Sequence, residues 1–198
     1  MKRNLYVLFS LLVLASMILA ACGGAAAPAA PTFKGTVTIT FTQEPDNLNP
    51  MYTDMSFSGY LRPFYLKPSW DFDENAKPVP VLAKEIPSAE NGGFSAEGKT
   101  VTIKLRDDIT WSDGEKITAD DYVFTFDMIM SDKNVPLSRY PYEDYVESVT
   151  AKDPTTVVIT LKEPFAAWLT SLFYWVLAKH VLQPVFDADG TIDNAAWN

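Results

Sequence analysis

The feature that most constrains the fold is an apolar run that ends at the only cysteine of the chain. Lys2 and Arg3 precede residues 5–21, which are almost wholly apolar, and small residues lead directly to Cys22. A basic start, an apolar stretch and small residues before a cleavage point are typical of a secretory signal. We therefore expect residues 1–21 to be a signal peptide, so that the folded domain begins later in the chain.

The residues around Cys22 predict a lipid anchor. Leu19-Ala20-Ala21-Cys22 resembles a bacterial lipobox, which implies cleavage before Cys22 and attachment of lipid to that residue. The alternatives are a leftover thiol in a signal peptide or an uncleaved membrane anchor. If Cys22 is lipidated, the mature chain has no free thiol, disulfide or cysteine-bound metal. Residues 22–35 are then the lipidated cysteine and a flexible linker of small residues and proline.

Composition and charge narrow the classes of function. Hydrophobic residues make up 47% of the chain, which is enough to form a core, and the formal net charge is -9. Removing Lys2 and Arg3 leaves the mature part near -9 - 2 = -11, which argues against a nucleic acid partner. His180 is the only histidine and is expected to cap a helix end or lie on the surface. No enzyme motif, cofactor site or metal site is predicted, although counting acids does not exclude a carboxylate pair that hydrolyses glycans.

Three segments alternate apolar and polar residues and are predicted to be strands. They are residues 36–42, 100–105 and 155–161, with Val101, Ile103 and Leu105 on one face of the second. Pro63 and Pro68 are expected to interrupt any helix between residues 60 and 70.

Two helices are predicted, one with a clear start. Thr118 is a natural N-cap, and Asp121 stands where a capping box needs an acid. The expected buried stripe of this helix is Tyr122, Val123, Phe126, Ile129 and Met130. A second, deeply buried helix is expected after Pro164, with its apolar face formed by Phe165, Trp168, Leu169, Leu172, Phe173 and Val176. Strands and helices that intersperse in this way favour a mixed α/β (α+β) fold.

Several of these segments together resemble a known family. Pro80-Val81-Leu82-Ala83, the strand that closes on Leu105-Arg106, and residues 109–124 (ITWSDGEKITADDYVF) are similar to the signature region of family 5 extracellular solute-binding proteins. This is the oligopeptide-, dipeptide- and nickel-binding group of ABC importers. Residues 44–50, 153–164 and 177–180 match further stretches, so the resemblance covers roughly residues 36–180.

The resemblance implies a two-lobed architecture like that of type II periplasmic binding proteins. By analogy, residues 36–60 form the first segment of lobe I, residues 61–164 form the inserted domain II, and residues 165–198 return to lobe I. Members of the family are much longer than this chain, and their lobe III has no counterpart here. We therefore expect an N-terminal fragment with only part of lobe I present.

The resemblance also implies a function and a set of partners. The expected function is capture of a peptide or similar small solute for the permease of an ABC importer, by an exported protein anchored to the cell membrane by lipid and facing the periplasm or the cell exterior. A surface lipoprotein acting as a sensor or adhesin and a secreted glycan hydrolase are the alternatives. The turn after the first strand borders the ligand cleft in the family, so the candidate ligand-binding residues are Gln43, Glu44, Asp46 and Asn47. That turn could equally serve only to connect elements. Trp111, close to a turn, is the fifth candidate.

Overall fold

The computed structural model describes residues 35–196 of the chain. The predicted signal peptide, Cys22 and all of the predicted linker except Gly35 lie outside the described residues. The chain separates into two units, Met1–Thr40 and Phe41–Asn198, and the second contains all the helices and strands described below.

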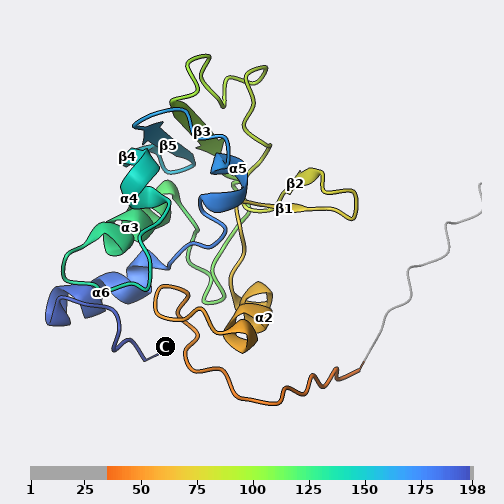
Figure 1. The fold of residues 1–198 in the computed structure, drawn as a ribbon, viewed down its shortest axis with the longest axis vertical. Helices are drawn as coiled ribbons and strands as arrows, with labels where there is room; N and C mark the ends of the chain where they lie inside the picture. The colour runs from red at the N-terminus through yellow and green to blue at the C-terminus, as the bar shows by residue number, and fades with distance from the viewer. Residues whose placement is uncertain (1–34, 197–198) are drawn as a thin grey trace, which may run out of the picture. The chain divides into compact units, whose positions relative to one another are not determined.

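The core is built on an antiparallel three-stranded sheet in the order β3-β5-β4 (Figure 1). β3 spans Thr100–Lys104, β5 spans Thr156–Leu161 and β4 spans Val146–Asp153. Val101 and Ile103 of β3 and Val157 and Ile159 of β5 are wholly buried. The strands predicted at residues 100–105 and 155–161 are therefore confirmed, and both follow the alternation of their sequences.

The sequence analysis missed β4. This strand pairs only with β5, and register shifts interrupt the pairing between Val146 and Ser148 and between Ala151 and Asp153. Only Val146 and Val149 are buried, because one neighbour and one packed face leave the rest of the strand exposed. An edge strand with so few buried positions has no clear alternation for a sequence to display.

Helix α3, Ala119–Met130, packs on this sheet and begins as predicted. Thr118 and Asp121 form a capping box, in which the Thr118 N–H donates to Asp121 Oδ2 at 2.8 Å. The predicted stripe is partly wrong. Tyr122 and Ile129 are buried, but the most buried positions also include Phe124, Thr125 and Met128, whereas Val123, Phe126 and Met130 are only partly buried. The face is shifted because α3 also packs against α4 (Tyr142–Tyr145) and α6 (Lys179–Asp189).

The long helix predicted after Pro164 is not formed. Only α5, Trp168–Ser171, is helical. From Leu172 to Leu177 the chain has bends and no regular secondary structure, Phe173 has a positive φ of 50°, and every residue except Tyr174 is buried. The backbone of this segment bonds to side chains instead of to its own carbonyls: Phe173 N–H donates to Tyr142 Oη at 2.8 Å, and Leu177 N–H to Thr125 Oγ1 at 2.9 Å. The predicted burial of Leu172, Phe173 and Val176 is confirmed, but apolar composition alone could not distinguish a helix from a buried irregular segment.

Two helices contain proline, and one of them corrects an expectation. α2, Ser56–Tyr65, continues through Pro63, and α6 continues through Pro184. Each proline removes one helical hydrogen bond, but helical bonding resumes beyond Pro63, where the Leu66 N–H donates to the Arg62 carbonyl at 2.9 Å, and α6 is held by the burial of Leu182. A hairpin of β1, Trp70–Phe72, and β2, Pro78–Pro80, projects from the body in Figure 1.

The strand predicted at residues 36–42 is absent. Residues 36–41 have no regular secondary structure, and Val37 and Ile39 are 84% and 52% exposed. An alternating sequence becomes a strand only where another strand supplies the hydrogen bonds, and none of the described strands pairs with this segment. The predicted boundaries at residues 60/61 and 164/165 stay predictions.

One buried carboxylate joins two helices that are far apart in sequence. Besides capping α3, Asp121 accepts the Lys179 N–H at the start of α6 through Oδ1 at 2.9 Å. Burial raises the pKa of Asp121, while the hydrogen bonds from the Thr118 and Lys179 amides act in the opposite direction. Thr125 extends the link, because its hydroxyl donates to the Asp121 carbonyl at 2.7 Å and accepts Leu177 N–H.

We predict that Asp121→Asn lowers the free energy of unfolding by about 1–3 kcal/mol, because the amide group turns a donor toward one of the two backbone N–H groups. The measurement is the midpoint of urea unfolding. Asp120→Asn is the matched control, since Asp120 is exposed and its distance of 3.9 Å to Lys179 Nζ is that of a weak surface pair. Equal losses in the two variants would contradict this role for Asp121.

Candidate functional site

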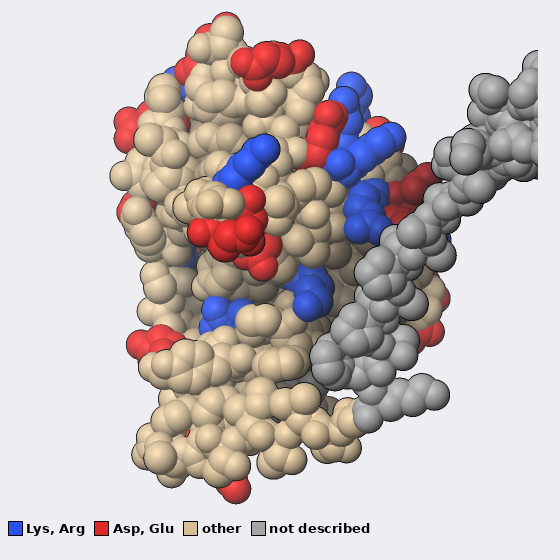
Figure 2. Space-filling model, turned by 90° about the vertical axis from the view of Figure 1, so that its right-hand side faces the viewer, with Lys and Arg blue, Asp and Glu red and all other residues tan. Residues whose placement is uncertain are grey.

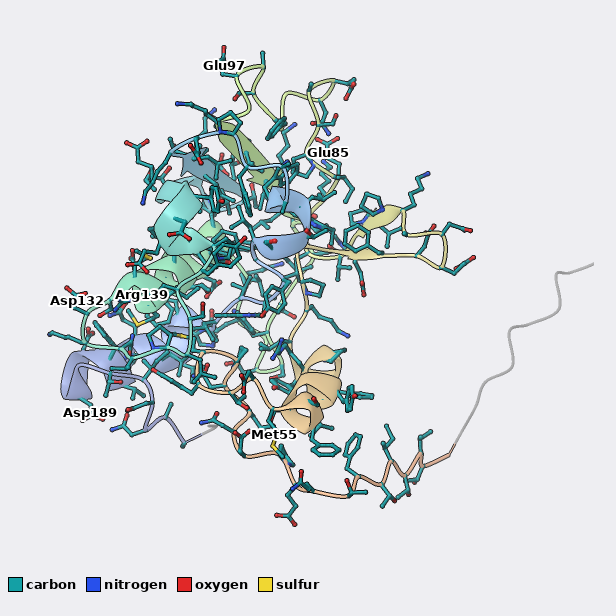
Figure 3. The ribbon with its side chains drawn as sticks, in the orientation of Figure 1. Met55, Glu85, Glu97, Asp132, Arg139 and Asp189 are labelled. Carbon is teal, nitrogen blue, oxygen red and sulfur yellow. The ribbon has the colours of Figure 1, made fainter. Side chains whose placement is uncertain are left out.

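A cavity of about 560 Å³ lies between four parts of the second unit. Its walls are the turn at residues 50–55 with helix α2, Ile129 of α3, the loop at residues 137–142, and residues 171–175. Met55, labelled in Figure 3, is the N-cap of α2 and lines this cavity. The volume is within the range of about 300–1,000 Å³ that is common for small-molecule sites.

Aromatic side chains form much of the lining. They are Tyr60, Tyr140, Tyr142, Tyr174 and Trp175. Tyr60 and Tyr140 are 60% and 59% exposed, so both rings are accessible to a solute at the mouth. Aromatic rings supply large apolar contact areas, and tyrosine adds a hydroxyl that can form hydrogen bonds. The lining therefore suits a solute with both apolar and polar groups.

Two charged residues, Asp54 and Arg62, also line the cavity. Asp54 is exposed, whereas Arg62 is partly buried at the last turn of α2. No described residue forms an ion pair with either side chain. The site thus offers a solute one negatively charged and one positively charged side chain, together with the hydroxyls of Ser56, Ser138 and Ser171.

Arg139 holds the loop that carries Tyr140. Its Nε donates to the Ile129 carbonyl at 3.1 Å and its Nη2 to the Ser131 carbonyl at 2.9 Å. These bonds supply donors to backbone carbonyls at the C-terminal end of α3. Its ion pair with Asp132, 3.7 Å away, adds little because Asp132 is fully exposed (Figure 3). The loop is positioned by these backbone contacts rather than by its own secondary structure.

A hydrogen bond and ring packing hold the cavity wall formed by Tyr142 and residues 171–175. The Tyr142 hydroxyl accepts the Phe173 N–H, and the Phe173 ring packs against Tyr142 and Tyr122 with centroids 5.4 and 5.0 Å apart. Burial raises the pKa of Tyr142 well above its ordinary value, so this phenol stays protonated and neutral. Tyr174 and Trp175 follow directly and line the cavity.

Four of the five predicted ligand-binding residues precede the cavity-lining residues in the chain and do not line the cavity themselves. Gln43 and Glu44 are exposed in the stretch that leads to it. Asp46 accepts hydrogen bonds from Thr53 Oγ1 at 2.6 Å and Ser58 Oγ at 2.9 Å, and Asn47 Oδ1 accepts Asn49 N–H at 2.6 Å. Asp46 and Asn47 thus shape the turn and the start of α2. A ligand-binding role for the four residues stays a prediction.

The fifth candidate, Trp111, lies elsewhere. It lines a separate cavity of about 340 Å³ together with Leu82, Ile109 and Val176. Its indole N–H is buried and lies close enough to lower the pKa of Asp121, without reaching hydrogen-bond geometry. Nearby, Asp113 Oδ2 and His180 Nε2 lie 2.7 Å apart, so His180 joins the first turn of α6 to the 112–115 turn.

The cavity residues Tyr60, Arg62, Tyr140 and Tyr174 were not predicted from the sequence. The available signal was weak: aromatic residues next to prolines in segments without regular periodicity, as in residues 138–142 (SRYPY). Such residues show no shared spacing, because the fold brings them together from four segments.

Two kinds of feature are absent from the part of the chain that the structure describes. Residues 35–196 contain no cluster of histidine, cysteine, aspartate and glutamate side chains that could hold a metal ion. Within the same range, no helix is both long enough and apolar enough to cross a membrane.

Comparison with known proteins identifies the family. Residues 77–198 match the family described as bacterial extracellular solute-binding proteins, family 5, middle region. The chain belongs to this family, and its mixed α/β fold is that of part of a type II substrate-binding protein. The resemblance predicted from residues 80–124 is confirmed.

Individual relatives agree with this assignment. The chain is 31% identical over 151 residues to protein XP55 of Streptomyces lividans, covering 73% of this chain and 25% of that protein. It is 39% identical over 84 residues to the glutathione-binding protein GsiB of Escherichia coli K12, covering 42% of this chain and 16% of that protein. The crystal structure of NikZ from Campylobacter jejuni with Ni(L-His) is 33% identical and superposes with a TM-score of 0.59, covering 71% of this chain and 27% of NikZ. The chain thus spans about a quarter or less of the length of these curated relatives.

We predict that Asp46→Ala speeds hydrogen exchange of the amides at residues 53–60 by about tenfold, because the carboxylate accepts from both Thr53 and Ser58. These hydrogen bonds lower the pKa of Asp46, so its stabilising effect is present above the ordinary carboxyl pKa and is lost as pH falls through the lowered value. Protection in the unaltered chain should therefore decrease in acid, and the variant should lose this dependence.

Glu44→Ala is the matched control for this prediction, since Glu44 is exposed and none of the hydrogen bonds described for this turn involves its side chain. A similar change in exchange in both variants would show that Asp46 does not hold the turn.

Proposed function

We propose that this protein captures a peptide or a similar small solute outside the cytoplasm and delivers it to the permease of an ABC importer. The observation that carries the proposal is the cavity lined by tyrosines, Trp175, Asp54 and Arg62 in a chain of the family 5 solute-binding proteins. Relatives described as binding glutathione or Ni(L-His) point to solutes of similar size. The proposed action is binding without catalysis, as the family is one of solute-binding proteins.

The proposed mechanism is closure around the solute. The cavity is bounded by α2, the 137–142 loop and residues 171–175, and Tyr60 and Tyr140 remain exposed at its mouth. Since the chain spans about a quarter of its relatives, we propose that a further lobe of the full protein covers this mouth when solute binds. The closed form would then dock on the permease.

Ligand binding should be measurable as stabilisation. A solute that binds only the folded state raises the free energy of unfolding by about 2.7 kcal/mol at one hundred times its dissociation constant. We predict such a shift, seen as a rise in melting temperature, with at least one member of a panel of glutathione, short peptides and nickel–histidine. A panel that leaves the melting temperature unchanged at millimolar concentration would argue against the proposal.

We further predict that Tyr140→Ala weakens binding of the positive solute by roughly three- to tenfold, the usual value of one aromatic contact. Val135→Ala is the matched control, because Val135 is 82% exposed in the same region and does not line the cavity. Isothermal titration calorimetry separates the two variants. Equal affinities would place the binding site elsewhere.

We also propose that Cys22 carries the lipid that holds the protein at the membrane, on the basis of Leu-Ala-Ala-Cys at residues 19–22. Cys22→Ser should abolish incorporation of labelled palmitate and move the protein from the membrane fraction to the soluble exported fraction. Ser10→Ala, within the apolar run, is the control and should leave labelling intact. Labelling that survives Cys22→Ser would refute the anchor.

A further inference from the structure

Arg62 stands out among the arginines that the structure describes. Arg106 is paired with Asp108 at 2.7 Å, and Arg139 donates to two carbonyls of α3. Arg62 has no comparable partner: its Nε is buried and finds no acceptor among the described residues. A buried donor without an acceptor is unusual in a folded protein and calls for an explanation.

The groups around Arg62 are neutral rather than acidic. Its guanidinium carbon lies 5.5 Å from the centroid of the Tyr174 ring, in a cation–π arrangement. It also approaches the phenol of Tyr65, which donates its own hydrogen to the Leu48 carbonyl at 2.6 Å. Asp54 lines the same cavity but forms no ion pair with Arg62. The positive charge is therefore held in place without being neutralised.

The location of Arg62 makes this charge available to a solute. Arg62 lines the cavity of about 560 Å³ and also a neighbouring one of about 260 Å³. It is fixed on α2, a helix whose start is held by Asp46, so the side chain projects from a positioned element rather than from a loop. On the face of the molecule shown in Figure 2, acidic and basic side chains are interspersed above and the lower part is mostly uncharged.

We propose that Arg62 binds a carboxylate of the captured solute, with the ring of Tyr174 helping to hold the guanidinium in place through the cation–π contact. The guanidinium presents parallel N–H groups that match the two oxygens of a carboxylate, and such bidentate pairs are stronger than neutral hydrogen bonds. The exposed rings of Tyr60 and Tyr140 then contact the apolar part of the same solute. This inference rests on the proposed function and selects its substrate class: small solutes with a free carboxylate, such as peptides with an unblocked C-terminus, rather than neutral oligosaccharides.

The test compares trileucine with a free C-terminal carboxylate against trileucine amide, by calorimetry on the full chain. The unaltered chain should bind the acid at least about tenfold more tightly than the amide. Arg62→Gln should bring the two affinities within about twofold of each other. Arg62→Lys should keep part of the preference, because a lysine supplies the charge without the paired N–H groups. Arg106→Gln, which removes an arginine already paired with Asp108, is the control and should keep the full preference.

The readout is the ratio of the affinities for the acid and the amide in the same variant. Partial unfolding lowers both apparent affinities by the same factor and leaves their ratio unchanged. An Arg62→Gln chain that still prefers the acid tenfold would overturn the role of Arg62 while leaving solute binding intact. An unaltered chain that binds acid and amide equally would overturn carboxylate recognition but not the proposed function. If the chain binds neither peptide and no member of the wider panel, both carboxylate recognition and the proposed function are overturned.

Discussion

The buried carboxylate of Asp121 is the contact on which the arrangement of the described unit depends. It caps α3 through the Thr118 amide and receives the Lys179 amide at the start of α6, 58 residues further along the chain. With Thr125, it fixes where the segment after α5 crosses the core. That segment carries Tyr174 and Trp175, so the position of one cavity wall follows from a hydrogen-bonding residue outside the cavity. The cost of burying Asp121 is offset by backbone donors rather than by a counter-ion.

The cavity is composite, and its parts are held by different means. α2 is fixed at its start by the hydrogen bonds of Asp46, the 137–142 loop by the contacts of Arg139 with α3, and residues 172–177 by Tyr142 and Thr125. Of these positioning residues only Tyr142 also lines the cavity, so removal of the others can alter binding without loss of a direct contact with the solute. Residues that position the walls and residues that line the cavity are thus mostly different, which is a common organisation for sites built on a rigid scaffold.

Sequence reasoning succeeded where one local pattern determines the structure. β3, β5 and the start of α3 were predictable because alternation and a capping box act within a few residues. It failed where tertiary contacts decide: β4 has little periodicity, α2 and α6 continue through proline, and residues 172–177 look helical but take their hydrogen bonds from distant side chains. The cavity was missed for the same reason, since Arg62 and Tyr174 become neighbours only in the fold.

The irregular run after α5 has a consequence for how binding preferences can diverge. Phe173, Trp175 and Val176 are at most 7% exposed, whereas Tyr174 between them is 48% exposed. Packing and backbone hydrogen bonds depend on the inward residues, so the outward position is free to change without disturbing the core. The irregular backbone thus gives this wall one exposed position at which selection can retune ligand range at little cost in stability.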